Sequence, residues 1–275
     1  MKIIDAHLHL FPSSPDTDAI AEKVGHRNST DHLRQVYGEL GMVHGVVMGN
    51  RSLDPSYHNY PADLFHYCIG LDSALMGRGE KPVPDLAERV EENLKRESCC
   101  GVKLYPGYNR LWLSAPVYEP VYQLAARYDK PVAVHMGLTA SSGAHLRYAH
   151  PLVLDETAAD HPGTRFVMCH FGNPFLESAA AVVEKNPNVA ADLSGLLEGR
   201  VDLDRYFEEQ AGYVSQLRTW LTAIQRWDDL MFGTDWPIVN LGEYIAFLQR
   251  LLPEKHWEAV LSGNADRIYG LGLRL

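Results

Sequence analysis

Two histidines alternate with aliphatic residues in the segment DAHLHLF near the amino terminus. His7 and His9 are two positions apart, so both side chains would project from the same face of a β-strand. Imidazoles on an otherwise apolar strand need hydrogen-bond partners or a metal ion, because unpaired polar groups are costly to bury. An HxH pair alone also fits a half-exposed strand, so the choice depends on the rest of the sequence.

More ionisable residues follow other short apolar segments. They are Lys103 in GVKLYP, His135 in PVAVHMG, His170 in FVMCHFG, Asp192 in VAADLSG and Asp235 in FGTDWP. Each has an ordinary interpretation alone, such as a buried histidine with a partner, a turn aspartate or a lysine at a strand terminus. These interpretations would all have to hold by coincidence at the same end of different strands. Three imidazoles and a carboxylate match the ligands of a catalytic divalent ion that keeps one position open for water.

Eight short apolar segments are predicted to be these strands. They span residues 2–10, 44–50, 65–72, 99–106, 131–137, 165–172, 188–195 and 229–237. Helical patterns lie between them, as in residues 84–97, 213–227 and 242–252. The first of these begins at Asp85 as a predicted cap and repeats Leu86, Val90 and Leu94 at helical spacing. Strands that alternate with helices indicate βα units and a parallel sheet.

Eight such units in 275 residues predict an α/β fold of the (β/α)8 (TIM) barrel type, with one domain over residues 1–275. The alternative is an open doubly wound sheet, which a glycine-rich phosphate loop after the first strand would favour. The first strand instead ends in HLHLFPSSP, and no GxGxxG pattern occurs. In a barrel, the residues at the carboxyl ends of the strands form the active site.

The composition narrows the class of protein. The net charge of −10 argues against a general nucleic-acid binder and against a surface that seeks anionic lipid. No segment approaches the ~20 apolar residues that span a membrane, and the amino terminus does not resemble a signal peptide. The four cysteines form no CxxC pattern, which is typical of a reducing compartment. We therefore expect a cytoplasmic protein with a small-molecule partner; the sequence leaves its oligomeric state open, a homo-oligomer included.

The ordered set of motifs resembles the amidohydrolase superfamily, in particular the amidohydrolase-related branch that includes aminocarboxymuconate semialdehyde decarboxylase. The motifs are DAHLHLF, GVKLYP, the VH of the fifth predicted strand, CHFG, DLSG, GTDWP and a closing NADRIYG helix. They extend over nearly the whole chain. An HxH pair combined with a late GTDxP is a fairly specific signature of that family.

The resemblance implies a metal site. It assigns His7, His9, His135 and Asp235 as the metal ligands. It places His170 beside the metal, where it polarises water or substrate, and makes Asp235 the proton acceptor from that water. One divalent ion is expected; the ligand set favours Zn²⁺, and Mn²⁺ is the alternative.

Lys103 has two interpretations within the resemblance. In two-metal relatives, a lysine on the fourth strand is carboxylated and bridges the ions, and His170 would then bind the second ion. The decarboxylase-like branch mostly has one metal, and there Lys103 would meet a substrate anion as a free ammonium. We expect the free lysine, as a catalytic and substrate-binding residue.

The loop YPGYNRLWL after the fourth predicted strand would lie above the metal. Its aromatic residues and one arginine suit a planar or carboxylate-bearing ligand, and we expect Tyr105 and Arg110 to bind substrate. Packing is the alternative for this cluster. Cys169 precedes His170 and should therefore point outward, between the barrel and its helices.

The expected site favours hydrolysis of a C–N or C–O bond, in an amide, ester or lactone that carries a carboxylate. The alternative is a non-oxidative decarboxylation of an unsaturated or aromatic acid, in which His170 or Asp235 delivers a proton to carbon. Some decarboxylases of the branch replace the first histidine of HxH with glutamate, so the intact His7 favours hydrolysis. A barrel that only binds a ligand is the third, non-enzymatic alternative.

Overall fold

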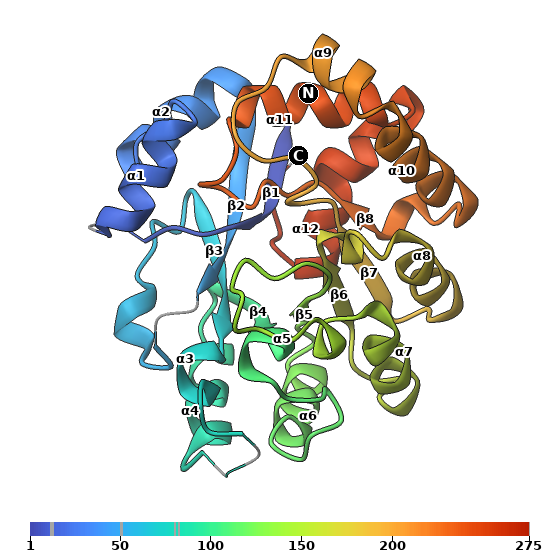
Figure 1. The fold of residues 1–275 in the computed structure, drawn as a ribbon. Helices are drawn as coiled ribbons and strands as arrows, with labels where there is room; N and C mark the ends of the chain where they lie inside the picture. The colour runs from blue at the N-terminus through green and yellow to red at the C-terminus, as the bar shows by residue number, and fades with distance from the viewer. Residues whose placement is uncertain (12–13, 50–51, 80, 82, 275) are drawn as a thin grey trace.

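The fold is an eight-stranded parallel β-barrel with helices around it, seen in a computed structural model that describes residues 1–11, 14–49, 52–79, 81 and 83–274 (Figure 1). The strands pair in chain order. They are β1 (Ile3–Leu8), β2 (Met42–Gly49), β3 (Phe65–Gly70), β4 (Cys99–Leu104), β5 (Val132–His135), β6 (Phe166–Cys169), β7 (Val189–Asp192) and β8 (Leu230–Met231). A parallel bridge between Leu8 and Trp236 and a hydrogen bond from Ala6 N to Phe232 O join the last strand region to the first. The predicted (β/α)8 barrel and its eight strands are confirmed.

Most of the helices form a ring around the outside of the barrel (Figure 1). They are α1 (Pro15–Lys23), α2 (Thr30–Leu40), α3 (Asp72–Leu75), α4 (Leu86–Leu94), α5 (Pro106–Asn109), α6 (Glu119–Arg127), α7 (Pro151–Asp160), α8 (Leu176–Lys185), α9 (Leu203–Glu209), α10 (Ala211–Ala223), α11 (Leu241–Leu251) and α12 (Asn264–Tyr269). In α4 the predicted apolar positions Leu86, Val90 and Leu94 are buried, as an amphipathic helix on a sheet requires. Asp85 precedes this helix, but its side chain does not cap it. No helix in the described ranges is both long and apolar enough to cross a bilayer.

The strands bury both of their faces. Outward side chains pack with the helices in one large apolar cluster, whereas Ile4, Ala6, Val46, Ala133 and Val167 belong to a second cluster inside the barrel. Ala265, Ile268 and Tyr269 of α12 join this second cluster. Burial on both faces explains why the strands read as nearly continuous apolar segments with few polar residues. The polar residues that remain therefore mark the places where the barrel interior is not simply packed.

The regular strand alternation that the sequence suggested for Asp5, His7 and His9 is interrupted in the structure. A register shift lies between Asp5 and Leu8 where β1 pairs with β2. Asp5 accepts hydrogen bonds from the hydroxyl of Thr234 at 2.6 Å, from Tyr37 at 3.3 Å and from the backbone N–H of His7 at 3.2 Å, but not from the imidazole of His7. His7 instead contacts Asp192 in the barrel interior. The shift thus separates a structural carboxylate from the two imidazoles.

Candidate metal centre

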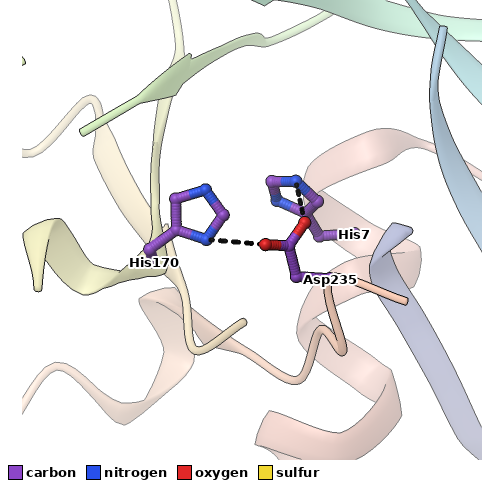
Figure 2. Close-up of side chains that lie close together, drawn as sticks. All are labelled: His7, His170 and Asp235. Carbon is purple, nitrogen blue, oxygen red and sulfur yellow. Dashed lines mark ion pairs between the residues drawn. The ribbon is translucent and has the colours of Figure 1, made fainter. Parts of the chain in front are cut away.

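Asp235 lies between two imidazoles at the carboxyl end of the barrel (Figure 2). Its Oδ1 is 3.5 Å from Nε2 of His7, and its Oδ2 is 4.0 Å from Nδ1 of His170. The three residues come from β1, from the turn after β6 and from the segment after β8. Ligand atoms of this trio lie within 4.8 Å of one another, which is a spacing that a single ion could bridge.

His9 and His135 complete the cluster on either side of the trio. His9 Nε2 is 3.2 Å from Oδ1 of Asp235, and His135 Nδ1 is 3.1 Å from Nε2 of His170. The other nitrogen of His135, Nε2, lies 2.9 Å from the carbonyl oxygen of Leu138. Three of the predicted ligands, His7, His9 and Asp235, therefore lie close to one another, and the fourth, His135, joins the cluster through its contact with His170.

Unusual backbone conformations aim two of these side chains. His170 has φ = 61° and Asp235 has φ = 58°, in the left-handed region that costs non-glycine residues of order 1–3 kcal/mol each. Gly195 passes close to both, since a Cβ there would lie 3.1 Å from Nδ1 of His170 and 3.3 Å from Oδ2 of Asp235. The strained backbone conformations therefore occur where the polar side chains of the site converge.

Asp192 contacts two residues of the cluster, His7 and His170. Its carboxylate is fully buried and lies 2.9 Å from Nδ1 of His7, and it accepts hydrogen bonds from the backbone N–H of His170 at 2.9 Å and from the Ser194 hydroxyl at 2.5 Å. The Ser194 oxygen is also 2.8 Å from Nδ1 of His170. The sequence analysis noted Asp192 at the end of a predicted strand but did not assign it to the site. It did not identify Ser194. The DLSG motif, which contains both residues, was the signal that could have found them.

A buried nitrogen atom supports a metal at this place. Nε2 of His7 faces Oδ1 of Asp235 at 3.5 Å and is buried without a hydrogen-bond partner. With Nδ1 of His7 donating to Asp192, its Nε2 presents a lone pair toward Asp235, which is how a carboxylate orients a metal-binding imidazole. The donor set of imidazoles and a carboxylate fits a divalent ion such as zinc. Which of the five side chains bind the ion stays a prediction.

Burial and mutual contact set the charge of the cluster. Burial, together with the nearby Lys103 ammonium, lowers the pKa of His7 to about 3. Burial also lowers the pKa of His135 and of His170. Burial alone would raise the pKa of Asp235, but the surrounding histidines hold it well below its usual range. Neutral imidazoles and an ionised carboxylate are the forms that bind a metal.

Cys169 does not point outward as the sequence predicted. It belongs to the apolar cluster inside the barrel, and its Sγ lies 2.7 Å from the ammonium of Lys103. Strand alternation fails here because His170, the next residue, turns into the left-handed conformation. Lys103 itself is fully buried. The Lys103 ammonium also lies 5.2 Å from the centroid of the Tyr105 ring, so it contacts a residue that lines the pocket.

A pocket of about 320 Å³ opens above the cluster. His9, His135, His170 and Asp235 line it, together with the apolar or aromatic side chains of Phe11, Ile20, Met76, Tyr105, Tyr108 and Ile238. Lys103 and Arg110 do not line it. The guanidinium of Arg110 donates to the carbonyl oxygen of Gly143 at 2.6 Å, outside the pocket wall. The roles predicted for Lys103, Tyr105 and Arg110 in binding substrate stay predictions.

Comparisons with known proteins agree with this architecture. An amidohydrolase family model matches residues 4–271. This chain belongs to the amidohydrolase family. The predicted family is thereby confirmed, and the chain is an enzyme of the amidohydrolase superfamily. No curated protein matches the sequence.

Solved structures of three proteins share the fold over nearly the whole chain. An amidohydrolase from Burkholderia multivorans with bound zinc is 19% identical, with a TM-score of 0.70 and coverage of 98% of this chain and 99% of that one. A probable 2-pyrone-4,6-dicarboxylic acid hydrolase from Acinetobacter baumannii is 16% identical, with a TM-score of 0.63 and coverage of 98% and 100%. A 2,6-dihydroxybenzoate decarboxylase from Rhizobium is 14% identical, with a TM-score of 0.65 and coverage of 98% and 98%. The fold is thus shared by hydrolases and decarboxylases alike.

Proposed function

We propose that this amidohydrolase hydrolyses a C–N or C–O bond of a small amide, ester or lactone with the help of one divalent ion. The observation that carries the proposal is the position of the Asp235 carboxylate, which faces His7 and His9 with one oxygen and His170 with the other at the floor of the pocket. A carboxylate placed in this way serves both metal binding and proton transfer. The zinc-bound relative of the same fold supports the choice of ion.

We assign the metal ligands to His7, His9, His135 and Asp235, with Zn²⁺ favoured over Mn²⁺. Imidazole nitrogens and a carboxylate match the ligand chemistry of such an ion. When bound, the ion would polarise the scissile carbonyl and lower the pKa of water from 15.7 to ≈ 7.

We assign Asp235 and His170 different roles in the reaction. Asp235 accepts the proton of the attacking water and returns it to the leaving nitrogen or oxygen. His170 lies 4.0 Å from Oδ2 of Asp235 and is held by Ser194, so it orients the water and the substrate carbonyl. Tyr105 offers its buried hydroxyl, which has no partner, as a hydrogen-bond donor to the substrate.

The charge of the substrate is a separate question from the reaction. The expected substrate carboxylate depended on Lys103 and Arg110, and neither side chain lines the pocket. A decarboxylation would use the same metal site but would require a proton donor toward carbon. Burial lowers the pKa of His170, and the surrounding histidines lower the pKa of Asp235, so both side chains are better suited to accept a proton than to donate one to carbon, which supports hydrolysis.

The test compares two kinds of substrate with purified, zinc-loaded protein. Lactones, esters and amides are assayed for acid release in ¹⁸O-labelled water, and aromatic and muconate-type acids are assayed for CO₂. We expect ¹⁸O in the product acid and a loss of about 10²–10⁴-fold in kcat for Asp235→Asn. Asp63→Asn is the control, because Asp63 is an exposed carboxylate paired with Arg34. Release of CO₂ without hydrolysis would overturn the proposal.

A further inference from the structure

The charged side chains in the pocket wall are acidic or imidazole groups. Asp72 and Asp235 supply carboxylates, and His9, His135 and His170 supply the rings. Among the described residues that line this pocket there is no lysine and no arginine. A carboxylate buried with a ligand needs an opposite charge or several donors, because an unpaired buried charge is strongly unfavourable. Apart from a bound metal ion, the described wall offers no such charge.

The cations near the pocket do not line it and have partners within the protein. Lys103 is fully buried, with its ammonium 2.7 Å from Sγ of Cys169 and 5.2 Å from the centroid of the Tyr105 ring. Arg110 donates to the carbonyl oxygen of Gly143. The guanidinium of Arg147 lies over the ring of Tyr148 at 4.7 Å and donates to its hydroxyl at 2.7 Å. Each of these side chains already has a partner that a substrate anion would have to displace.

Most of the remaining wall is apolar, and its side chains come from several elements. Ile20 comes from α1, Met76 follows α3, Tyr108 belongs to α5 and Ile238 follows β8. These side chains lie above the polar floor formed by Asp235 and its histidines. An apolar wall over a few convergent polar groups is typical of sites that take a largely apolar ligand and orient it by one polar end.

Tyr105 supplies one polar group within this wall. The residue is only 6% exposed, its ring stacks on His135 with the centroids 6.3 Å apart, and its hydroxyl has no hydrogen-bond partner. A phenol is protonated near neutral pH and donates one hydrogen bond. The group is therefore suited to a neutral acceptor on the substrate, such as a carbonyl, ester or ring oxygen.

We infer that the substrate is an uncharged lactone, ester or amide with an apolar body, and that a carboxylate on that body is rejected. This inference deepens the proposed hydrolase function and rests on it for the bond that is cleaved. It replaces the carboxylate-bearing substrate that the sequence predicted. The apolar body contacts Met76, Ile20 and Ile238, and the neutral acceptor meets Tyr105.

A binding experiment tests the charge preference without requiring turnover. Calorimetry on the zinc-loaded protein compares a phenyl-substituted lactam with the same lactam bearing a carboxylate on the phenyl ring. We expect the neutral lactam to bind at least about tenfold more tightly, which corresponds to about 1.4 kcal/mol. Tyr105→Phe should weaken binding of the neutral lactam while the protein keeps its zinc.

A charge added at the pocket provides the matched control. Met76 is 60% exposed and lines the pocket, whereas Leu152 is 55% exposed and does not. Met76→Lys should reduce or reverse the preference for the neutral lactam, and Leu152→Lys should leave it unchanged. Equal or tighter binding of the carboxylate lactam to the wild-type protein overturns the inference, and so does binding of neither compound.

The outcome separates this inference from the proposed function. If neutral esters are hydrolysed but carboxylate-bearing ones react faster, the charge preference is wrong and the hydrolase assignment stands. If the neutral lactam binds preferentially but no ester, lactone or amide is hydrolysed in labelled water, the hydrolase assignment is wrong and the pocket preference stands.

Discussion

The two ends of the barrel each hold histidines in direct contact, but in different surroundings. At the amino end, Nε2 of His44 on β2 lies 2.7 Å from Nδ1 of His66 on β3. At the carboxyl end, Nδ1 of His135 lies 3.1 Å from Nε2 of His170, and Asp235 lies beside them. In the described ranges, both groups of three residues that could hold an ion include His7 at the carboxyl end. A contact between two imidazoles therefore does not make a metal site; what distinguishes the carboxyl end is a carboxylate whose two oxygens face several imidazoles.

The largest effect should come from removing two of the predicted ligands. We expect the His7→Ala, His9→Ala double variant to lose its ion and to fall in kcat/KM by more than about 10³-fold, because activation of water is lost with the ion. Metal content is measured by elemental analysis after dialysis. The His44→Gln, His66→Gln double variant is the matched control and should keep its ion and its activity. Full metal content in the first variant would contradict the site.

A substitution of Asp192 tests whether the metal site depends on a carboxylate that contacts the predicted ligand His7. Asp192→Asn keeps the shape of the side chain but weakens its contact with Nδ1 of His7, so the ring loses its fixed tautomer. We expect zinc affinity or activity to fall about 10–100-fold. Competition with a chelator measures the affinity, and thermal unfolding reports whether the variant is folded. An unchanged affinity in a folded variant would show that His7 is oriented by other contacts.

The barrel and the positions of most site residues were predictable from the sequence, because both depend on local patterns. Eight apolar segments alternating with amphipathic helices predicted the barrel, and the carboxyl ends of its strands gathered His7, His135, His170 and Asp235. These positions follow from strand direction, which the chain order of a βα fold determines.

What escaped prediction depends on departures from regular strands and on distant partners. The register shift after Asp5 separates it from His7, and the left-handed conformation of His170 leaves Cys169 inside the barrel. Alternation rules assume an unbroken strand, so they fail at such points. The roles of Asp192 and Ser194 depend on contacts between β7 and residues far along the chain. A single sequence records such contacts only weakly.

The amino-end pair should affect stability instead of activity. Burial lowers the pKa of His44 to about 4 from its ordinary 6.5, with the neighbouring His66 adding to the effect and Asp63 opposing it. The folded state then binds fewer protons than the unfolded state between these values. The stabilisation is complete above about pH 6.5 and is lost as the pH falls toward 4, by on the order of 1–3 kcal/mol.

Denaturant unfolding at pH 7 and pH 5 measures this loss. We expect His44→Gln to lose less stability than the wild-type protein between the two values, because one group that titrates on unfolding is removed. His145→Gln is the control, since His145 is an exposed residue of the loop after β5. The same pH dependence in His44→Gln and in the wild-type protein would show that the amino-end pair does not resist protonation.

The smallest effect is expected from Lys103, which lies inside the barrel beneath the carboxyl-end histidines. The sequence predicted that its ammonium meets a substrate anion, but the structure buries it completely against Cys169. Lys103→Met preserves the length of the side chain and removes its charge. If the substrate is uncharged, KM should change by less than about twofold, which is about 0.4 kcal/mol, and the protein should keep one zinc ion.

Each other result in Lys103→Met would assign the residue a different role. A strong rise in KM with an unchanged metal content would mean that the ammonium reaches the substrate after a rearrangement that frees it from Cys169. Loss of one of two ions, with reconstitution that depends on bicarbonate, would mean that the lysine is carboxylated and bridges a second metal. Either result would also weaken the case for an uncharged substrate. An unchanged KM and one zinc ion would instead mean that Asp235 and its neighbouring histidines act without the charge of Lys103.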